Sequence, residues 1–223
     1  DAGLREAYAA EISRIYGTAF APAEVAITSG CNQAYVVTMM ALARAGDNVL
    51  LPTPWYFNHE MTLTMLGVEA RPLPCAPEAG FVPDVATAEA LIDDRTRAIV
   101  LVTPNNPTGT TTPLATTRAI LAATDAIVVV DEAYQEFARD PGQTALTLLP
   151  EFGNLVVART MSKAFALAGG RLGYFAAAPA IVDACRIVRL PYHLSAQTQA
   201  LARVALAHAP EMLAQVDRLR EIR

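Results

Sequence analysis

Residues 98–109, AIVLVTPNNPTG, carry the pattern that decides the fold: an apolar run that stops at a sharp turn. A short apolar run bounded by Pro, Asn and Gly is typical of a strand that is buried on both faces. Residues 126–131, AIVVVD, repeat the run and end in a carboxylate. Strands of this kind occur in parallel sheets whose two faces are covered by helices.

Strands and helices alternate outward from this stretch along the chain. Strands are predicted at residues 25–28, 48–51, 68–71, 98–103, 126–130, 155–158 and 172–176, and helices at residues 1–16, 33–45, 58–66, 85–92, 114–123 and from 179 to the end. Residues 72–83 form a proline-rich connector. The alternation predicts an α/β fold with a mainly parallel central sheet and helices on both faces.

The composition excludes several classes of function. Hydrophobic residues make up 53% of the chain and charged residues 17%, which suits strands buried on both faces. The net charge is −5 and the 17 basic residues are scattered, so no nucleic-acid surface is expected. No apolar run reaches the roughly 18 residues of a membrane span. The three cysteines form no CxxC pair, which argues against a metal site or disulfides and favours a cytoplasmic protein.

Polar groups follow the predicted strands, at the end where parallel sheets bind ligands. The first is Ser29-Gly30-Cys31-Asn32, whose backbone N–H groups at a helix start suit phosphate; a plain turn with a helix cap is the alternative. The second is Asn105-Asn106-Pro107-Thr108-Gly109, which is either an ordinary turn or a place where an Asn amide faces a ligand.

Two further groups contain charged side chains. In Asp131-Glu132-Ala133-Tyr134, a carboxylate at the end of a buried strand needs a partner, so Asp131 either caps a helix or pairs with a cationic ligand. Thr160-Met161-Ser162-Lys163 lies in an apolar stretch, and Arg171 follows eight positions after Lys163. Lys163 suits a nucleophilic amine and Arg171 suits bidentate phosphate binding; a surface lysine and a surface arginine are the alternatives.

Taken together and in this order, the four groups resemble the class I and II aminotransferases of the pyridoxal 5'-phosphate (PLP) fold-type I superfamily. The resemblance implies that Lys163 is the catalytic residue, which is linked covalently to PLP and then moves a proton. Asp131 is implied to pair with the pyridinium nitrogen, and Asn106 and Tyr134 to hydrogen-bond the phenolic oxygen of the ring.

The same resemblance assigns the remaining contacts to the cofactor. Tyr56 is implied to stack on the ring, with Trp55 as the weaker alternative. The phosphate is implied to be held by the side chains of Thr160, Ser162 and Arg171 and by the backbone N–H groups of Cys31 and Asn32. No metal is expected. His59, His193 and His208 are not expected to be catalytic, because Lys163 already supplies the base.

Different parts of the chain resemble different subgroups of the family. From about Asn105 onward, above all in residues 159–174 and 188–195, the sequence resembles histidinol-phosphate aminotransferases. Residues 28–34 and 54–59 resemble broad-specificity class I aminotransferases. The favoured interpretation is a histidinol-phosphate transaminase of histidine biosynthesis; an aromatic or aspartate-type enzyme is the alternative. A junction between two parents near residues 105–109 would also explain the division.

The resemblance also implies an organisation. Residues 1–195 correspond to the PLP-binding large domain without its N-terminal arm, and residues 196–223 to the helical start of the link to a small C-terminal domain. The expected partners are an amino donor, a 2-oxo acid and a second copy of the chain. Two alternatives stay open: a related PLP-dependent decarboxylase, and the non-catalytic PLP-binding domain of a transcription regulator.

Overall fold

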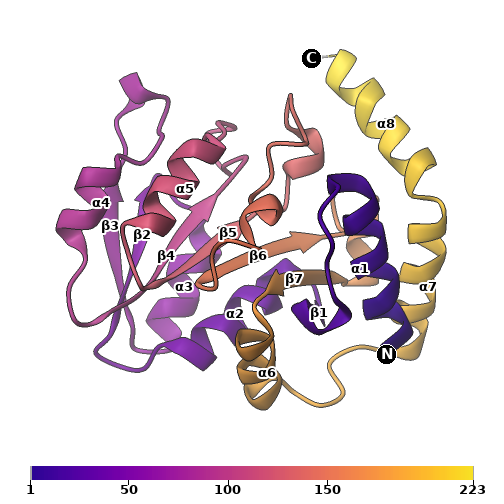
Figure 1. The fold of residues 1–223 in the computed structure, drawn as a ribbon, viewed down its shortest axis with the longest axis horizontal. Coiled ribbons are helices and arrows are strands. Elements are labelled where there is room, and N and C mark those ends of the chain that lie inside the picture. Colours follow the sequence, from indigo (N-terminus) through magenta and orange to yellow (C-terminus); the bar gives the residue numbers. More distant parts are fainter. Residues whose placement is uncertain (1, 223) are drawn as a thin grey trace.

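The computed structural model describes residues 2–222, which fold around a seven-stranded sheet (Figure 1). The order across the sheet is β1-β7-β6-β5-β4-β2-β3. All neighbours from β3 to β6 are parallel, whereas β7 runs antiparallel to both β6 and β1. The predicted mainly parallel sheet is therefore confirmed. Its strands are β1 (Val25–Thr28), β2 (Asn48–Thr53), β3 (Glu69–Pro74), β4 (Thr96–Val102), β5 (Ile127–Asp131), β6 (Leu155–Thr160) and β7 (Gly173–Ala177).

Eight α-helices of the described residues surround this sheet, and they agree with the predicted helices to within a few residues. They are α1 (Ala2–Tyr16), α2 (Cys31–Leu42), α3 (Phe57–Met65), α4 (Val85–Leu91), α5 (Leu114–Ala122), α6 (Pro179–Val188), α7 (Ala196–Ala207) and α8 (Ala209–Glu221).

The third strand departs from the sequence prediction. Pro72 and Pro74 belong to β3, although the sequence assigned them to the connector. Proline cannot donate a hydrogen bond to a neighbouring strand, so it is tolerated at the edge of a sheet. β3 is such an edge, because β2 is its only neighbour in the sheet.

Alternate residues of the strands feed two separate cores, one on each face of the sheet. In β4, Ile99 and Leu101 join the core that includes α1, α5 and α7. Ala98 and Val100 join the other core, which includes α2, α3 and α6. Helices thus cover both faces, as the continuous apolar strands predicted.

Residues 196–222 form α7 and α8. In Figure 1, α7 lies beside α1, and its buried residues Ala202 and Ala205 share the core of α1. The division at residue 195 stays a prediction. No helix of residues 2–222 is both long enough and apolar enough to cross a membrane.

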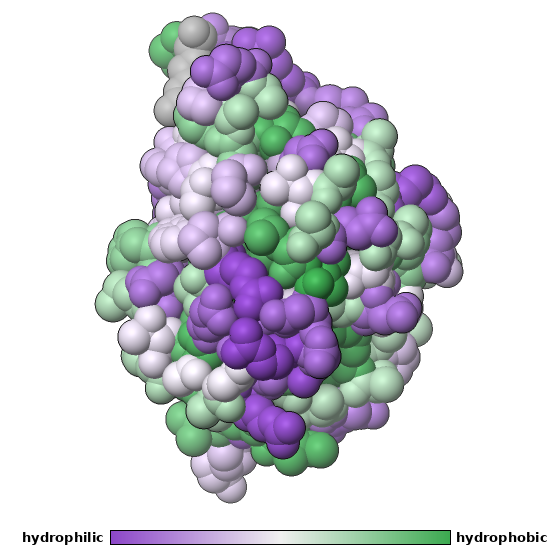
Figure 2. Space-filling view, turned by 90° about the vertical axis from the view of Figure 1, so that its left-hand side faces the viewer, coloured by the Kyte–Doolittle hydropathy of each residue, from purple (hydrophilic) through white to green (hydrophobic). Residues whose placement is uncertain are grey.

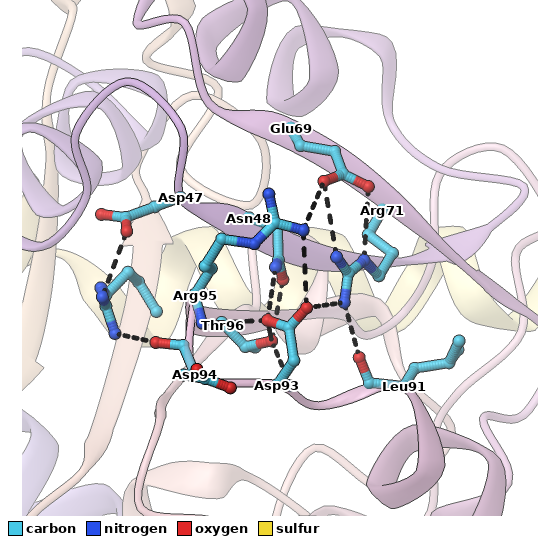
Figure 3. A network of polar contacts seen from close by, with 10 residues as sticks. Asp47, Asn48, Glu69, Arg71, Leu91, Asp93, Asp94, Arg95 and Thr96 are labelled. Atoms are coloured by element: carbon cyan, nitrogen blue, oxygen red, sulfur yellow. Dashed lines mark hydrogen bonds and ion pairs between the residues drawn. The ribbon is translucent and has the colours of Figure 1, made fainter.

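A polar network joins the beginnings of β2, β3 and β4 at the edge of the sheet (Figure 3). The Asp93 carboxylate accepts hydrogen bonds from Asn48 Nδ2 at 2.8 Å, Arg71 Nη1 at 2.9 Å and Thr96 Oγ1 at 3.1 Å. Figure 2 views the molecule from the side of α4 and β3 and shows a hydrophilic cluster at its centre. Charged side chains at an edge strand discourage pairing with another sheet.

Candidate functional site: a pocket at the strand ends

A cavity of about 140 Å³ lies where β4, β5 and β6 end. Val102, Asp131 and Thr160, the last residues of these strands, line it. The structure brings all ten residues predicted for the site into this one lining; their individual roles stay predictions. They are Cys31, Asn32, Tyr56, Asn106, Asp131, Tyr134, Thr160, Ser162, Lys163 and Arg171.

One corner of the pocket combines a helix N-terminus with a guanidinium group. Gly30 has a φ of +87° at the N-cap of α2, and a Cβ on it would lie 2.9 Å from Arg171 Nη2. The guanidinium therefore lies directly over this glycine. Thr160 Oγ1 and Ser162 Oγ lie 3.0 Å apart in the same lining. Backbone N–H groups, hydroxyls and a cation in one corner have the chemistry that suits an anion, and their role in holding phosphate stays a prediction.

Asp131 is buried at the floor of the pocket and has three donors around its carboxylate. Cys31 Sγ lies 3.3 Å and the backbone nitrogen of Ala133 3.0 Å from Oδ1, while His59 Nε2 lies 3.2 Å from Oδ2. Burial raises the pKa of Asp131, but the hydrogen bonds from His59, Cys31 and Ala133 outweigh burial, and its pKa lies below the ordinary value. The carboxylate is therefore ionised at neutral pH.

His59 is the functional residue that sequence reasoning missed. It lies on α3, its side chain is 2% exposed, and its ring packs 4.3 Å from the Tyr35 ring and 5.4 Å from the Tyr56 ring. The available signal was its spacing, since His59 follows Tyr56 by about one helical turn. His59 thus contacts Asp131 without lining the larger cavity, and the expectation that no histidine is catalytic stays a prediction.

Lys163 lies at the exposed side of the pocket, and it is the only lysine in the chain. Its Nζ lies 5.1 Å from the centroid of the Tyr134 ring. Both Lys163 and Arg171 are exposed, as the surface alternatives supposed, but both face the same cavity. Of the two aromatic candidates, Tyr56 lines this cavity, whereas Trp55 lines a smaller one beside His59.

A buried ion pair supports the strand ends that carry Asp131 and Thr160. Glu132 does not line the pocket; its Oε2 accepts from Arg159 Nε at 3.0 Å and Nη2 at 2.7 Å, and from Thr144 Oγ1 at 2.6 Å. Both charged side chains are at most 3% exposed. A buried pair needs such additional hydrogen bonds to offset the loss of hydration. Glu132 is therefore structural, although it belongs to the same sequence motif as Asp131.

The family model for aminotransferase class I and II matches residues 1–223. The chain belongs to the class I and II aminotransferases. The histidinol-phosphate aminotransferase of Rhodococcus jostii (strain RHA1) is 46% identical over 218 residues, which cover 97% of this chain and 56% of that protein. The histidinol-phosphate aminotransferase of Thermobifida fusca (strain YX) is 46% identical over 199 residues, covering 89% and 54% respectively. The chain thus spans about half the length of these curated relatives.

A solved structure confirms the fold expected for this aminotransferase chain. A mutant aspartate aminotransferase from Thermus thermophilus superposes with a TM-score of 0.87 at 27% identity, covering 99% of this chain and 62% of that one. Class I and II aminotransferases depend on PLP, which confirms the predicted cofactor. The Rhodococcus alignment runs across residues 105–109 and both sides of them, so it lends no support to a junction there.

Proposed function

We propose that this aminotransferase chain binds PLP in the pocket and transfers an amino group from histidinol phosphate to a 2-oxo acid. One observation carries the proposal. Lys163, the only lysine of the chain, and the buried, ionised Asp131 line one cavity, and the residues of the anion corner line it too. The names of the relatives from Rhodococcus and Thermobifida support the substrate.

The anion corner fits the phosphate of PLP. Arg171 would form charge-assisted hydrogen bonds with it, and the first N–H groups of α2, from Cys31 and Asn32, would donate as well. Thr160 and Ser162 would add hydroxyl donors. The missing side chain of Gly30 leaves the space in which Arg171 approaches the helix.

The floor and the wall of the pocket fit the ring. Bound PLP supplies an electron sink for the negative charge that develops at the substrate α-carbon. Asp131 favours the protonated ring nitrogen because its own carboxylate is held ionised. Asn106 and Tyr134 would hydrogen-bond the phenolic oxygen, and Tyr56 would pack against the ring face.

Lys163 carries out the proton movements. Its amine would hold the cofactor covalently and would be freed when a substrate amine binds. The freed Nζ would then serve as the base that removes and returns the proton of the substrate α-carbon. The flexible four-carbon stem of lysine suits an amine that must reach two atoms in succession.

The proposal extends to assembly and location. A homodimer is supported by the family to which the chain belongs. A cytoplasmic location is supported by the cysteines, because Cys31, Cys75 and Cys185 are all unbridged and buried.

The first test uses the natural full-length protein that carries this sequence, titrated with PLP and followed by absorbance. We expect a new visible band and, after borohydride reduction, a cofactor adduct on the peptide that contains Lys163. Lys163→Ala removes both. Lys163→Arg keeps the positive charge but removes the nucleophilic amine, so it also lacks the adduct. An adduct that forms equally in these variants contradicts the site.

The substrate is tested separately, by transamination with 2-oxoglutarate. We expect histidinol phosphate to give a higher kcat/KM than aspartate, tyrosine or phenylalanine. A preference for aspartate or an aromatic amino acid selects the broad-specificity alternative. Release of carbon dioxide in place of a keto product selects a decarboxylase, and PLP binding without turnover of any donor selects the regulator domain.

A further inference from the structure

A second, smaller cavity shares Val102 with the pocket and has His59 in its own lining. Its volume is about 10 Å³, close to the minimum that holds a single water molecule, roughly 10–15 Å³. Most of its lining is apolar, but His59 and Asn105 both contribute to it. It is distinct from the larger cavity that contains Lys163.

Two unpaired polar atoms belong to the lining residues of this small cavity. Within residues 2–222, four buried side-chain atoms have no hydrogen-bond partner, and they include His59 Nδ1 and Asn105 Oδ1. A buried polar atom without a partner costs more free energy than one hydrogen bond contributes. Two such atoms at one cavity of this size point to a shared partner.

The orientation of the Asn105 amide follows from its other contact. Its Nδ2 lies 3.2 Å from the carbonyl oxygen of Pro54, which can only accept a hydrogen bond. The amide nitrogen must therefore face Pro54, and the oxygen Oδ1 is the atom left buried and unpaired. Asn105 thereby joins the segment after β4 to the segment after β2.

The hydrogen-bonding capacity of the two atoms identifies the partner. An ionised Asp131 only accepts hydrogen bonds, so the Nε2 of His59 carries the proton that it shares with Asp131. With the ring proton on Nε2, Nδ1 is an acceptor, as is Asn105 Oδ1. Two acceptors cannot bond to each other, but one water molecule can donate to both.

We propose that a buried water molecule bridges His59 Nδ1 and Asn105 Oδ1, and that Asn105 is a positioning residue for Asp131. The water fixes the His59 ring with Nε2–H directed at the carboxylate, which keeps Asp131 ionised. The water bridge stands on the geometry alone, whereas the effect on catalysis rests on the proposed transaminase function.

The bridge is tested in the full-length protein without PLP, by 15N NMR of the histidine rings and by high-resolution crystallography. The signal of His59 is identified by its loss in His59→Gln. We expect His59 as the Nε2–H form with a hydrogen-bonded Nδ1, and density for one water between Nδ1 and Oδ1. A proton on Nδ1 in place of Nε2, an unbonded Nδ1, or a direct contact without water overturns the bridge.

Asn105→Leu is the decisive variant, because a side chain of similar size without polar atoms removes one of the two acceptors that hold the water. We expect the 15N signal of Nδ1 to move to that of an unbonded ring nitrogen. Thr112→Val is the control, since Thr112 lines the same cavity and the substitution removes a hydroxyl while keeping the shape. A Thr112→Val shift as large as that of Asn105→Leu assigns the water to Thr112 and overturns the role of Asn105.

The positioning role is tested with PLP bound. Asn105→Leu should lower kcat on the order of tenfold, the scale seen for outer-shell partners, while the KM of the amino donor changes little. Thr112→Val should leave both parameters unchanged. An unchanged kcat in Asn105→Leu overturns the positioning role. If the NMR result holds and no donor reacts even with the wild type, the proposed function fails and the water bridge stands.

Discussion

Gly173 begins β7 directly opposite Thr28, the last residue of β1. A Cβ at this position would lie 2.6 Å from the backbone nitrogen of Cys31 and 2.6 Å from the carbonyl carbon of Gly30. Both contacts are with backbone, which cannot rotate away as a side chain can. The close approach is what brings Arg171, two residues before Gly173, to the N-terminus of α2.

We expect Gly173→Ala to destabilise the protein. Overpacking of this kind costs about 1–3 kcal/mol, which corresponds to a fall in Tm of roughly 2–12 °C for a domain of this size. The measurement is thermal unfolding followed by circular dichroism. Gly153→Ala is the control, because nothing lies within 4 Å of its Cβ, and its Tm should change by about 2 °C or less. Equal Tm values for the two variants would contradict the argument.

For single residues, the sequence predicted a place in the site where a polar or charged side chain stands among apolar neighbours. Asp131 stands out at the end of an apolar strand, and Lys163 stands out in an apolar stretch. His59 and Asn105 do not stand out, because their roles depend on which atom of each side chain is left without a partner in the fold. An atom left without a hydrogen-bond partner in the fold leaves no pattern in residue spacing or composition.

Among the elements, the edge strand β3 is tied by Arg71 to Asp93, which precedes β4. Asp93 accepts hydrogen bonds from Asn48 and Arg71, and these place its pKa well below the ordinary value. A carboxylate whose pKa is lower in the folded state stabilises the fold above its unfolded pKa of about 3.9. That contribution is lost as the pH falls below this value.

We expect Asp93→Asn to lower the Tm at pH 7, and the gap from the wild type to close as the pH falls below about 4. The measurement is Tm as a function of pH for both proteins. Asp94→Asn is the control, because Asp94 enters the network through its backbone oxygen, which accepts from Arg97. A gap that stays constant from pH 7 to pH 3 would show that the loss is not electrostatic.

The types and order of the elements follow from apolar periodicity, which is a local property of the chain. The direction of β7 and the strand character of Pro72 and Pro74 do not, since both depend on neighbours in the sheet. β7 was predicted as a strand, but its apolar run is equally compatible with a parallel or an antiparallel position.

For the whole molecule, PLP binding to the pocket should raise the free energy of unfolding, because the cofactor binds only the native state. PLP at 100 times its Kd should stabilise the native state by about 2.7 kcal/mol, a rise in Tm of roughly 5–10 °C. The measurement is Tm with increasing PLP. Pyridoxal, which lacks the phosphate, is the control and should give a smaller rise because it cannot contact Arg171, Thr160 and Ser162. Equal rises would show that the anion corner does not hold the cofactor.

The position of β1 at the end of the sheet has a consequence for synthesis on the ribosome. Among the strands of residues 2–222, β1 comes first in the sequence, yet its neighbour in the sheet is β7, the last of them. About 145 residues separate Thr28 from Gly173, and translation at about 5–20 residues per second takes roughly 7–30 seconds to cover them. During that interval the nascent β1 lacks β7, its partner among the described strands, which makes it a natural contact point for a chaperone.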